Sequence, residues 1–581
     1  GGRPEDGVLP KIELGFDEEQ ARAEASRILA EAWPTLNPTA IITSRTQEEV
    51  RGIGSPILLP FGATGLLLLI ACGNVGALSL GEIQGRMQEV ATRAAIGAGR
   101  LRVARQLVTE SLVLGLAGSA LGGLLAAGCT RVFVAFAPPI PRMDQVHVNP
   151  GVLVFAAALG TLSGILFGLA PALVSSRSAV SPTLRAGGRT GTRRQLGLGR
   201  LILGGEVALT IMLLVAGGLL ARSLTRLLDV ELGFRPEQIA TVEVGLPDAR
   251  YGWSVKGAAW GFMDEVLREM EGIPDASAVT AANLLPFPDS PAEWGSRAHR
   301  EDSTYLMPEL YNVAPGYLDF MGIPVLEGRG ILPSDNADAP AIAVVSRSLA
   351  RALWGDRSPV GLEMFYPMGA VTVVGVAGDT RQATLQDDPP LTFYVPFAQH
   401  SRTRVTFAAR TRGRPEDVLS AMREALWAVD PELAITGSGS LEGAIVSSAS
   451  EERYRTLIMA AFALLATLLS AVGIGGVTAR QVSQRTRELG IRKALGAPDT
   501  KLVGGVVRSA AITGLAGVGA GLAGVFWLRP ILAAFLFGVE TFDPLVYGGM
   551  GALFVVISAA AAYLPARKLL EVDPVGALRQ E

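Results

Sequence analysis

Charged residues are scarce in this 581-residue sequence. Asp, Glu, Lys and Arg make up 18% of it and hydrophobic residues 49%, whereas a typical soluble domain carries roughly a quarter charged residues. Over so long a chain, this deficit argues against an ordinary cytosolic enzyme, a disordered protein and a nucleic-acid-binding protein. The net charge of −3 also leaves no general excess of basic residues to hold a phosphate backbone.

Cysteine, histidine and lysine are rare as well. Two cysteines exclude a disulfide scaffold and most cysteine-based metal sites. The three histidines, His147, His299 and His400, are too far apart to show ligand spacing. None of the five lysines stands in a Gly-x4-Gly-Lys-Ser/Thr phosphate loop. We therefore expect no metal site, no bound cofactor and no ATP-hydrolysing site in this chain.

Seven long segments contain almost no charge. A charged residue at the centre of a membrane helix costs roughly 2.5–3.5 kcal/mol, so charge-free gaps of about 20 residues predict membrane spans. The alternative is a set of buried helices in a large soluble protein, but such helices are usually shorter and carry a polar stripe. The pattern predicts a polytopic α-helical membrane protein with spans in 52–81, 111–130, 145–176, 201–221, 457–479, 509–528 and 544–566.

Glu206 is the one residue among Asp, Glu, Lys and Arg inside these segments. An acid within a membrane span is a functional candidate by default. Because Glu206 follows Arg200 closely, at the basic end of its segment, we expect its carboxylate to reach the interface with water.

Arginine and lysine are concentrated in alternate loops. The basic loops are 81–105, 175–200 and 480–503, and the poor ones are 131–144 and 529–543. Since basic loops stay in the cytoplasm, residues 1–51 and 223–455 are predicted to lie outside and the C-terminus inside. An outside N-terminus without a signal sequence predicts an upstream span that this sequence lacks, and hence a fragment or truncated product.

The sequence repeats itself with an offset of 399 residues. Residues 86–98, RMQEVATRAAIGA, match residues 485–497, RTRELGIRKALGA. The match extends without gaps into the following span, where a set of glycines recurs. Small residues at i and i+4 let helices in a membrane approach closely. We therefore expect helix packing, within each half or between the halves, at Gly115, Gly118, Gly122, Gly514, Gly517 and Gly521.

The long outer segment 223–455 alternates strand-like and helix-like runs. Runs rich in β-branched residues predict strands at 239–246, 342–345, 371–376 and 405–409. Apolar periodicity predicts helices at 258–270, 347–353 and 415–428. This interleaving is typical of an α/β domain with βαβ-type units.

These features together resemble the MacB/FtsX-like permease family of ABC transporters. The resemblance rests on residues 482–497, on 322–329 (GIPVLEGR) and on 342–354, and the doubled module looks most like the family's duplicated "orphan" permeases. It implies an extracytoplasmic α/β MacB-type periplasmic core domain and two FtsX-like helical bundles.

The resemblance also divides the chain. Residues 1–51 are expected to be a remnant of a first periplasmic domain, with a helix near 18–33. Residues 52–185 are the first three-helix FtsX-like domain, with a coupling segment at 82–105, and 186–200 are a cytoplasmic linker. The second repeat then comprises its first span at 201–222, the periplasmic core domain at 223–455, and the three-helix domain at 456–581, with a coupling segment at 480–503.

The resemblance implies that the repeated cytoplasmic motif is a coupling helix that docks on an ATPase subunit. Glu and Arg at i,i+4 form a favourable helix pair, and the following glycine suits a helix C-cap. The alternative is a solvated connector. We expect ATPase coupling by Glu89, Arg93, Gly97, Ala98, Glu488, Arg492, Gly496 and Ala497. The first copy has Thr92 and Ala94 where the second has Ile491 and Lys493, so the equivalence of the two copies stays open.

The implied function is that of the permease subunit of an ABC transporter. ATP-driven motion of a separate ATPase would be relayed to the periplasmic domains (mechanotransmission), for export or extraction of an amphiphile, peptide, lipoprotein or drug. One alternative is an FtsX-like signalling scaffold that controls an envelope enzyme. Another is a membrane-embedded enzyme, for which we find no catalytic constellation.

The implied location is the bacterial inner membrane, with the large domain periplasmic and the C-terminus cytoplasmic. The implied partners are an ABC ATPase with a MacB/LolD-like nucleotide-binding domain, which would carry ATP and Mg²⁺, together with membrane lipids and a periplasmic adaptor. Nucleic acid is not among them.

Overall fold

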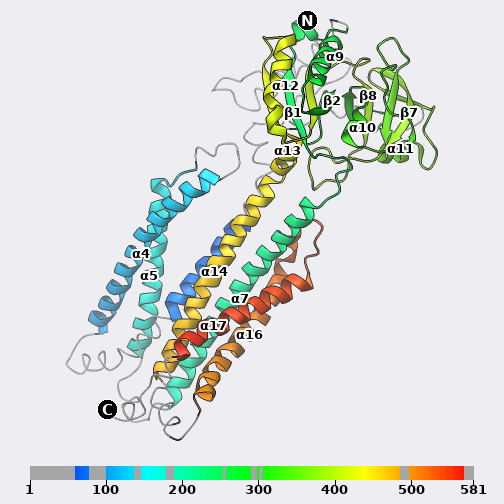
Figure 1. Cartoon of the computed structure of the whole chain (residues 1–581). Coiled ribbons are helices and arrows are strands. Elements are labelled where there is room, and N and C mark those ends of the chain that lie inside the picture. Colours follow the sequence, from blue (N-terminus) through cyan, green and yellow to red (C-terminus); the bar gives the residue numbers. More distant parts are fainter. Residues whose placement is uncertain are drawn as a thin grey trace, which may run out of the picture.

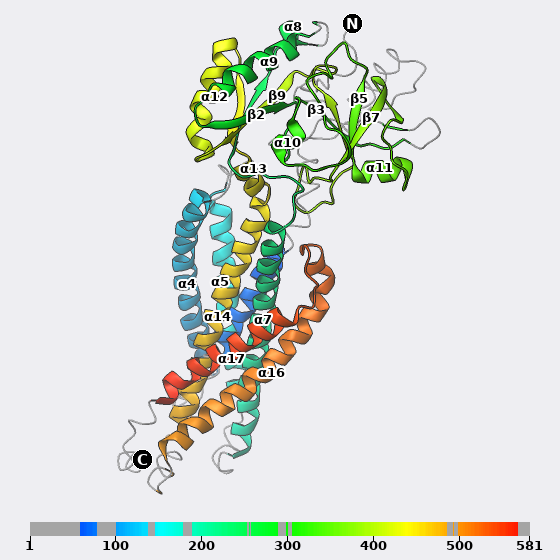
Figure 2. The ribbon, with the colours of Figure 1, turned by 45° about the vertical axis from the view of Figure 1, so that its right-hand side comes forward.

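The protein consists of a long helical bundle with an α/β domain at one end (Figures 1 and 2). This computed structural model describes residues 59–77, 100–136, 146–177, 189–252, 255, 257–288, 298–299, 305–484, 492, 495 and 498–567. The helix expected near 18–33 lies outside them.

The seven charge-free segments all coincide with helices. These are Leu59–Ala77, α4 (Arg100–Phe136), α5 (Pro150–Arg177), α7 (Arg189–Leu228), α14 (Ser450–Gln484), α16 (Asp499–Ala533) and α17 (Pro544–Arg567). Six of them are long and apolar enough to cross a membrane, whereas the described apolar part of α5, Pro150–Leu162, is shorter than a span. The prediction of a polytopic helical membrane protein is confirmed.

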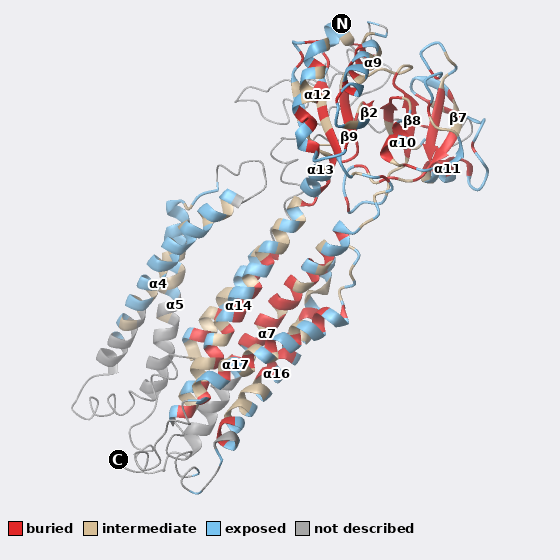
Figure 3. Cartoon of the chain, viewed as in Figure 1, coloured by how far each residue is buried: buried red, intermediate tan, exposed pale blue. Residues whose placement is uncertain are grey.

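Helix α7 forms the centre of the bundle. Its residues Val207, Ile211, Val215 and Leu219 are fully buried, and α7 carries more buried residues than its neighbours (Figure 3). A helix that is apolar on all sides belongs inside a bundle. The surrounding helices instead expose large apolar side chains, such as Leu124 on α4 at 72% exposure, as expected for surfaces that face lipid tails.

Helices α4 and α5 pack against each other and stand beside the α7–α14–α16–α17 cluster (Figures 1 and 2). Their contact is close because Gly160 of α5 faces Ser119 and the Gly115 carbonyl of α4. The Ser119 hydroxyl donates to Gly115 O at 2.8 Å, which satisfies a polar group that lipid could not.

The outer domain is built on one mixed ten-stranded sheet. The strand order is β10-β1-β9-β2-β3-β8-β5-β7-β4, with β6 paired to β7. The strands are β1 (Ile239–Gly245), β2 (Ala276–Ala282), β3 (Glu309–Val313), β4 (Val325–Gly328), β5 (Ile342–Ser346), β6 (Glu363–Tyr366), β7 (Gly369–Ala377), β8 (Thr392–Pro396), β9 (Arg404–Thr411) and β10 (Ile435–Ser440). The four strands predicted from β-branched runs correspond to β1, β5, β7 and β9.

Strands β10, β1, β9 and β2 form two interlocked split βαβ units. Helix α9 (Ala258–Glu271) connects β1 to β2, with β9 inserted between them, and α12 (Pro415–Val429) connects β9 to β10, with β1 inserted. All neighbouring pairs are therefore antiparallel. Both helices bury apolar side chains in one core, including Phe262, Met263, Phe407, Met422 and Leu426. The expected βαβ connectivity is present, but in this split form.

The rest of the sheet comes from the insertion between β2 and β9. Helix α11 (Arg347–Trp354) lies between the parallel strands β5 and β7 in sequence, and Ser346 caps it by accepting a hydrogen bond from Leu349 N at 3.2 Å. The remaining short helices of the domain are α8 (Asp248–Tyr251), α10 (Tyr317–Met321) and α13 (Leu441–Ser448).

The motif at 322–329 makes a sharp path from α10 through β4. Gly322 ends α10 with a φ of 69°, and Gly328 has a φ of 69° beside the neighbouring strand. A Cβ at Gly328 would lie 2.1 Å from Val374 O, so only glycine allows β4 to approach β7 there.

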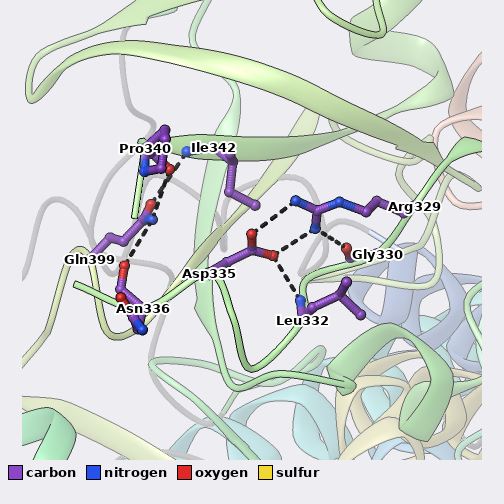
Figure 4. A network of polar contacts seen from close by, with 8 residues as sticks. All are labelled: Arg329, Gly330, Leu332, Asp335, Asn336, Pro340, Ile342 and Gln399. Atoms are coloured by element: carbon purple, nitrogen blue, oxygen red, sulfur yellow. Dashed lines mark hydrogen bonds and ion pairs between the residues drawn. The ribbon is translucent and has the colours of Figure 1, made fainter. Parts of the chain in front are cut away.

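Arg329 then anchors the loop that follows β4 (Figure 4). Its guanidinium donates to both Asp335 oxygens, at 2.7 and 2.9 Å, and Asp335 also accepts from Leu332 N at 2.9 Å. Burial acts to raise the pKa of Asp335, but the bonds from Arg329 and Leu332 outweigh it and hold the pKa below its usual value. Farther along the loop, the carbonyl oxygens of Asn336 and Pro340 each accept a hydrogen bond from Gln399, which follows β8.

We predict that Asp335→Asn lowers the free energy of unfolding of the outer domain by about 1.5–3 kcal/mol, the usual worth of a hydrogen bond to a charged group. Because the folded-state pKa of Asp335 is lowered, its contribution is present above the ordinary aspartate range and is lost as pH falls through the folded-state pKa. Denaturation at neutral and at acidic pH should show the wild-type advantage shrinking in acid. A constant difference would contradict this.

Candidate functional site: the joint between bundle and outer domain

Most of the predicted coupling residues lie outside the described residues. Glu89, Arg93, Gly97 and Ala98 fall in 78–99, and Glu488, Gly496 and Ala497 fall between α14 and α16. Arg492 is described, and it is helical and exposed. Their role as an ATPase contact therefore stays a prediction.

The glycines of the second repeat lie on helix–helix contacts. A Cβ at Gly517 would lie 2.6 Å from Val207 Cβ, and one at Gly521 would lie 2.6 Å from Ala208 O. Both positions face α7, whereas Gly514 faces Ser558 of α17 at 3.8 Å. Since lipid supplies no hydrophobic drive between helices, this close approach of α16 to α7 is what packs the pair.

The equivalent glycines of the first repeat are placed differently. A Cβ at Gly118 or Gly122 would meet no described atom within 4 Å, and only Gly115 lies at a close contact, with its carbonyl against Gly160. The two repeats thus share the glycine pattern on α4 and α16 but use it differently.

Two helices of the bundle continue into the outer domain. Helix α7 leads through residues 229–238 into β1, and β10 leads through α13 into α14 (Figure 1). Strands β1 and β10 pair with each other, from Ala240 opposite Ser440 onward. Helices α7 and α14 also pack together, with Gly217 of α7 against Met459 and Ala463 of α14. The two connections between bundle and outer domain, α7 to β1 and β10 to α14, are therefore neighbours both in the bundle and in the outer domain.

Polar contacts fix the outer end of α7 to the loop between α16 and α17. Arg222 Nη1 donates to Asp543 Oδ1 at 2.8 Å, and Ser223 Oγ accepts from Phe537 N at 2.7 Å. Arg226 donates to Gly538 O. Asp543 also accepts from Leu545 N at 3.0 Å and Val546 N at 3.3 Å, so one carboxylate both caps α17 and holds α7.

The outer end of α14 also contacts both the loop that follows α16 and the outer domain. The Arg455 guanidinium lies 5.3 Å from the ring centroid of Phe535, and Gln386 of the outer domain donates to Glu452 at 2.5 Å. A cavity of about 90 Å³ lies between these elements, lined in part by Leu220, Leu227 and Phe537. Ligand pockets usually measure about 300–1,000 Å³, so this joint is a packed connection rather than a binding pocket.

Known protein families match both the helical bundle and the outer domain. The FtsX-like permease C-terminal domain matches residues 61–180 and again 460–574. The MacB-like periplasmic core domain matches residues 205–425. Together they account for both copies of the helical module and for the domain above the joint.

The chain belongs to the MacB/FtsX-like family of ABC transporter permeases. The macrolide export ATP-binding/permease protein MacB of Marinobacter nauticus is 26% identical to it over 44% of this chain and 41% of that protein. The uncharacterised ABC transporter permease YknZ of Bacillus subtilis is 24% identical over 54% of this chain and 77% of that protein.

Two further proteins are similar to this permease. The pyoverdine export ATP-binding/permease protein PvdT of Pseudomonas syringae is 25% identical over 44% of the permease and 40% of that protein. The periplasmic region of MacB from Actinobacillus actinomycetemcomitans aligns with 38% of the permease and 95% of that structure, with 14% identity and a TM-score of 0.27. The permease spans less than half the length of MacB and PvdT.

The structure corrects the expectation for Glu206. Its side chain does not reach the interface: Glu206 is 3% exposed, and it is buried among α7, α14 and the helix of residues 59–77. The expectation was wrong because it used distance along the sequence from Arg200, whereas the direction of the side chain is set by the face of α7 that meets the other helices.

Sequence reasoning also missed the joint residues of the permease. Asp543 followed by Pro544 is a helix-start signal, with a capping side chain and a proline at the first helical position. That signal could have identified the cap of α17. Nothing local to the sequence pairs Asp543 with Arg222, which lies 321 residues away.

We predict different effects for one methyl group at equivalent positions of the two repeats. Gly521→Ala should lower the free energy of unfolding by up to about 2 kcal/mol, because overpacking against the backbone oxygen of Ala208 costs up to about 3 kcal/mol and the gain from alanine in a helix is about 1 kcal/mol. The matched variant Gly122→Ala should be neutral or stabilising. Thermal midpoints in mild detergent compare them, and equal shifts would contradict the packing of α16 on α7.

We predict a graded series at Asp543. Asp543→Ala should destabilise the bundle by about 2 kcal/mol, since it removes a helix cap worth about 1 kcal/mol and a charge-assisted bond. Asp543→Asn should cost about half as much, because asparagine caps as well as aspartate but carries no charge. Arg222→Gln should resemble Asp543→Asn in thermal unfolding. If the Asn and Ala variants behave alike, the ion pair rather than the cap carries the whole effect.

Proposed function

We propose that this permease is the membrane subunit of an ABC exporter and relays the ATP-driven motion of a separate ATPase to its outer domain. The observation that carries the proposal is the pair of helices that enter adjacent strands of one sheet. Helix α7 has 40 residues and α14 has 35, or about 60 and 50 Å at 1.5 Å per residue. Each exceeds the bilayer core of about 30 Å.

The geometry favours transmission of force over conduction. A push on the inner ends of α7 and α14 would reach β1 and β10 directly, because the joint has no flexible linker longer than residues 229–238. Among the described spans, apolar residues predominate in the buried interior, and the buried polar residues are mostly single threonines and serines, which is unlike the continuous polar lining of a channel. The substrate would therefore be handled outside the membrane.

The substrate class follows from the family and from this outside route. An amphiphile, peptide, lipoprotein or drug would be exported or extracted at the outer domain, in keeping with relatives named for macrolide and pyoverdine export. A periplasmic adaptor would extend the path. ATP and Mg²⁺ would bind the partner ATPase, and this chain would carry no enzymatic site and no cofactor of its own.

The arrangement in the membrane follows from the basic loops. The coupling segments 82–105 and 480–503 and the C-terminus would lie in the cytoplasm, where the ATPase docks. The outer domain would lie in the periplasm of a bacterium whose inner membrane holds the bundle. The two coupling segments would offer one docking helix to each half of a dimeric ATPase.

We predict that charge reversal in the coupling segments uncouples the ATPase. Glu89→Lys and Glu488→Lys should each reduce copurification with the cognate ATPase and stimulated ATP hydrolysis by about tenfold or more, because like-charge contacts at an interface cost several kcal/mol. Glu424→Lys, on an exposed face of α12, is the matched control and should change neither. If both reversals retain wild-type association and hydrolysis, the assignment of these segments fails.

A further inference from the structure

Three polar side chains are buried where the first repeat meets the second inside the bundle. Glu206 of α7, Asn74 of the helix Leu59–Ala77 and Ser470 of α14 are 3%, 7% and 0% exposed. Both Glu206 carboxyl oxygens, Asn74 Oδ1 and Ser470 Oγ have no hydrogen-bond partner among the described residues. Buried acceptors without a partner are costly, above all in a membrane, so something must satisfy them.

Asn74 and Glu206 meet at a glycine of α14. A Cβ at Gly473 would lie 2.1 Å from Asn74 Oδ1 and 2.9 Å from each Glu206 carboxyl oxygen. The two polar groups therefore lie side by side against the bare backbone of α14. Any larger residue at 473 would fill the space that they share.

The two repeats contribute equivalent positions to this contact. The repeat offset of 399 residues places Gly473 at the position that Asn74 occupies in the first repeat. Contact between equivalent positions is expected where two copies of a module pack about a local two-fold axis. The cluster thus lies on the contact between the repeats.

The orientation of the Asn74 amide is set by the backbone. Asn74 Nδ2 donates to Leu469 O at 2.8 Å, and a carbonyl oxygen can only accept, so the nitrogen must point to it. The remaining atom, Oδ1, lies beside Gly473 with both Glu206 carboxyl oxygens, and none of these three atoms receives a hydrogen bond from the second Nδ2 hydrogen or from any other described donor. An ionised carboxylate would place acceptor against acceptor, whereas a protonated carboxyl has one hydrogen to donate.

No charged side chain is bonded to Glu206 in the described structure. The helix Leu59–Ala77 has no charged residue. On α14, α16 and α17, the nearest charged residues in sequence to the surrounding contacts are Arg480, Arg508 and Arg567. Counted along its own helix at 1.5 Å per residue, each of these arginines is at least about 9 Å from the part of that helix that packs near Glu206. On α7 itself, Arg200 lies about 9 Å from Glu206 by the same measure.

We propose that Glu206 and Asn74 form an intramembrane proton-binding site, in which the Glu206 carboxyl keeps its proton and donates it to Asn74 Oδ1. The shared hydrogen bond joins the first repeat to α7 of the second. Loss of the proton leaves a negative charge facing an amide oxygen in the bundle, which weakens the contact between the repeats. The site makes the packing of the two halves sensitive to proton binding, whichever ATPase or substrate the permease serves.

The test uses the full chain in lipid nanodiscs with Glu206→Gln, Glu206→Leu and Asn74→Leu. Glutamine keeps the shape and the hydrogen donor of the protonated acid but cannot ionise. We expect Glu206→Gln to match wild-type thermal stability at about pH 4 and to exceed it by a growing margin up to about pH 9, because above the ordinary glutamate range only the wild type must take up a proton or bury a charge on folding. Both leucine variants should lose stability at both pH values.

Infrared spectroscopy reads the proton directly. A carbonyl band of a protonated carboxyl group should be present in the wild type at neutral pH and absent from Glu206→Gln, and Glu265→Gln, on the exposed face of α9, should leave it unchanged. Two results would overturn the proposal. One is a wild type that lacks this band and is stabilised by Na⁺ over choline, which would mean a metal cation in place of the proton. The other is Glu206→Gln being less stable than wild type at every pH, which would mean an ionised carboxylate.

Discussion

The close packing of α7 against its neighbours is the constraint on which the rest of the structure depends. In a membrane, helices gain nothing from leaving lipid, so they hold together through backbone approach and interlocking side chains. Val207 and Ile211 fit the glycine face of α16, while Gly217 and Gly218 of α7 admit α14 and α17. Helix α7 is therefore held on three sides, which is what the proposed transmission of motion would require.

The outer domain continues that rigidity. Helices α7 and α14 emerge side by side and lead into β1 and β10, which are hydrogen-bonded to each other over five residue pairs. An apolar cluster that contains Leu227 of α7, Leu441 of α13 and Ala449 before α14 extends from the bundle into the domain. Under the proposed function, a displacement of the helices would move the edge of the sheet, and the split βαβ arrangement would pass that movement to α9 and α12.

Much of this fold was predictable from local sequence. The strands β1, β5, β7 and β9 and the helices α9, α11 and α12 lie within a few residues of where β-branched runs and apolar periodicity indicated. Buried strands and amphipathic helices have patterns that depend only on their own residues. The strand order was not predictable, because β9 inserts between β1 and β2 through pairings between residues more than 100 positions apart, such as Ile239 with Arg410.

The sequence by itself determined which segments are helices in the membrane and that the module occurs twice, because the cost of charge in lipid and the identity of repeated residues are local properties. Only the tertiary structure decided how those segments are used. Gly517 and Gly521 touch α7, whereas the identical Gly118 and Gly122 touch no described atom, and Glu206 turns inward to Asn74 rather than outward to water. A contact depends on which helix arrives at a face, and no stretch of sequence on one helix specifies its partner.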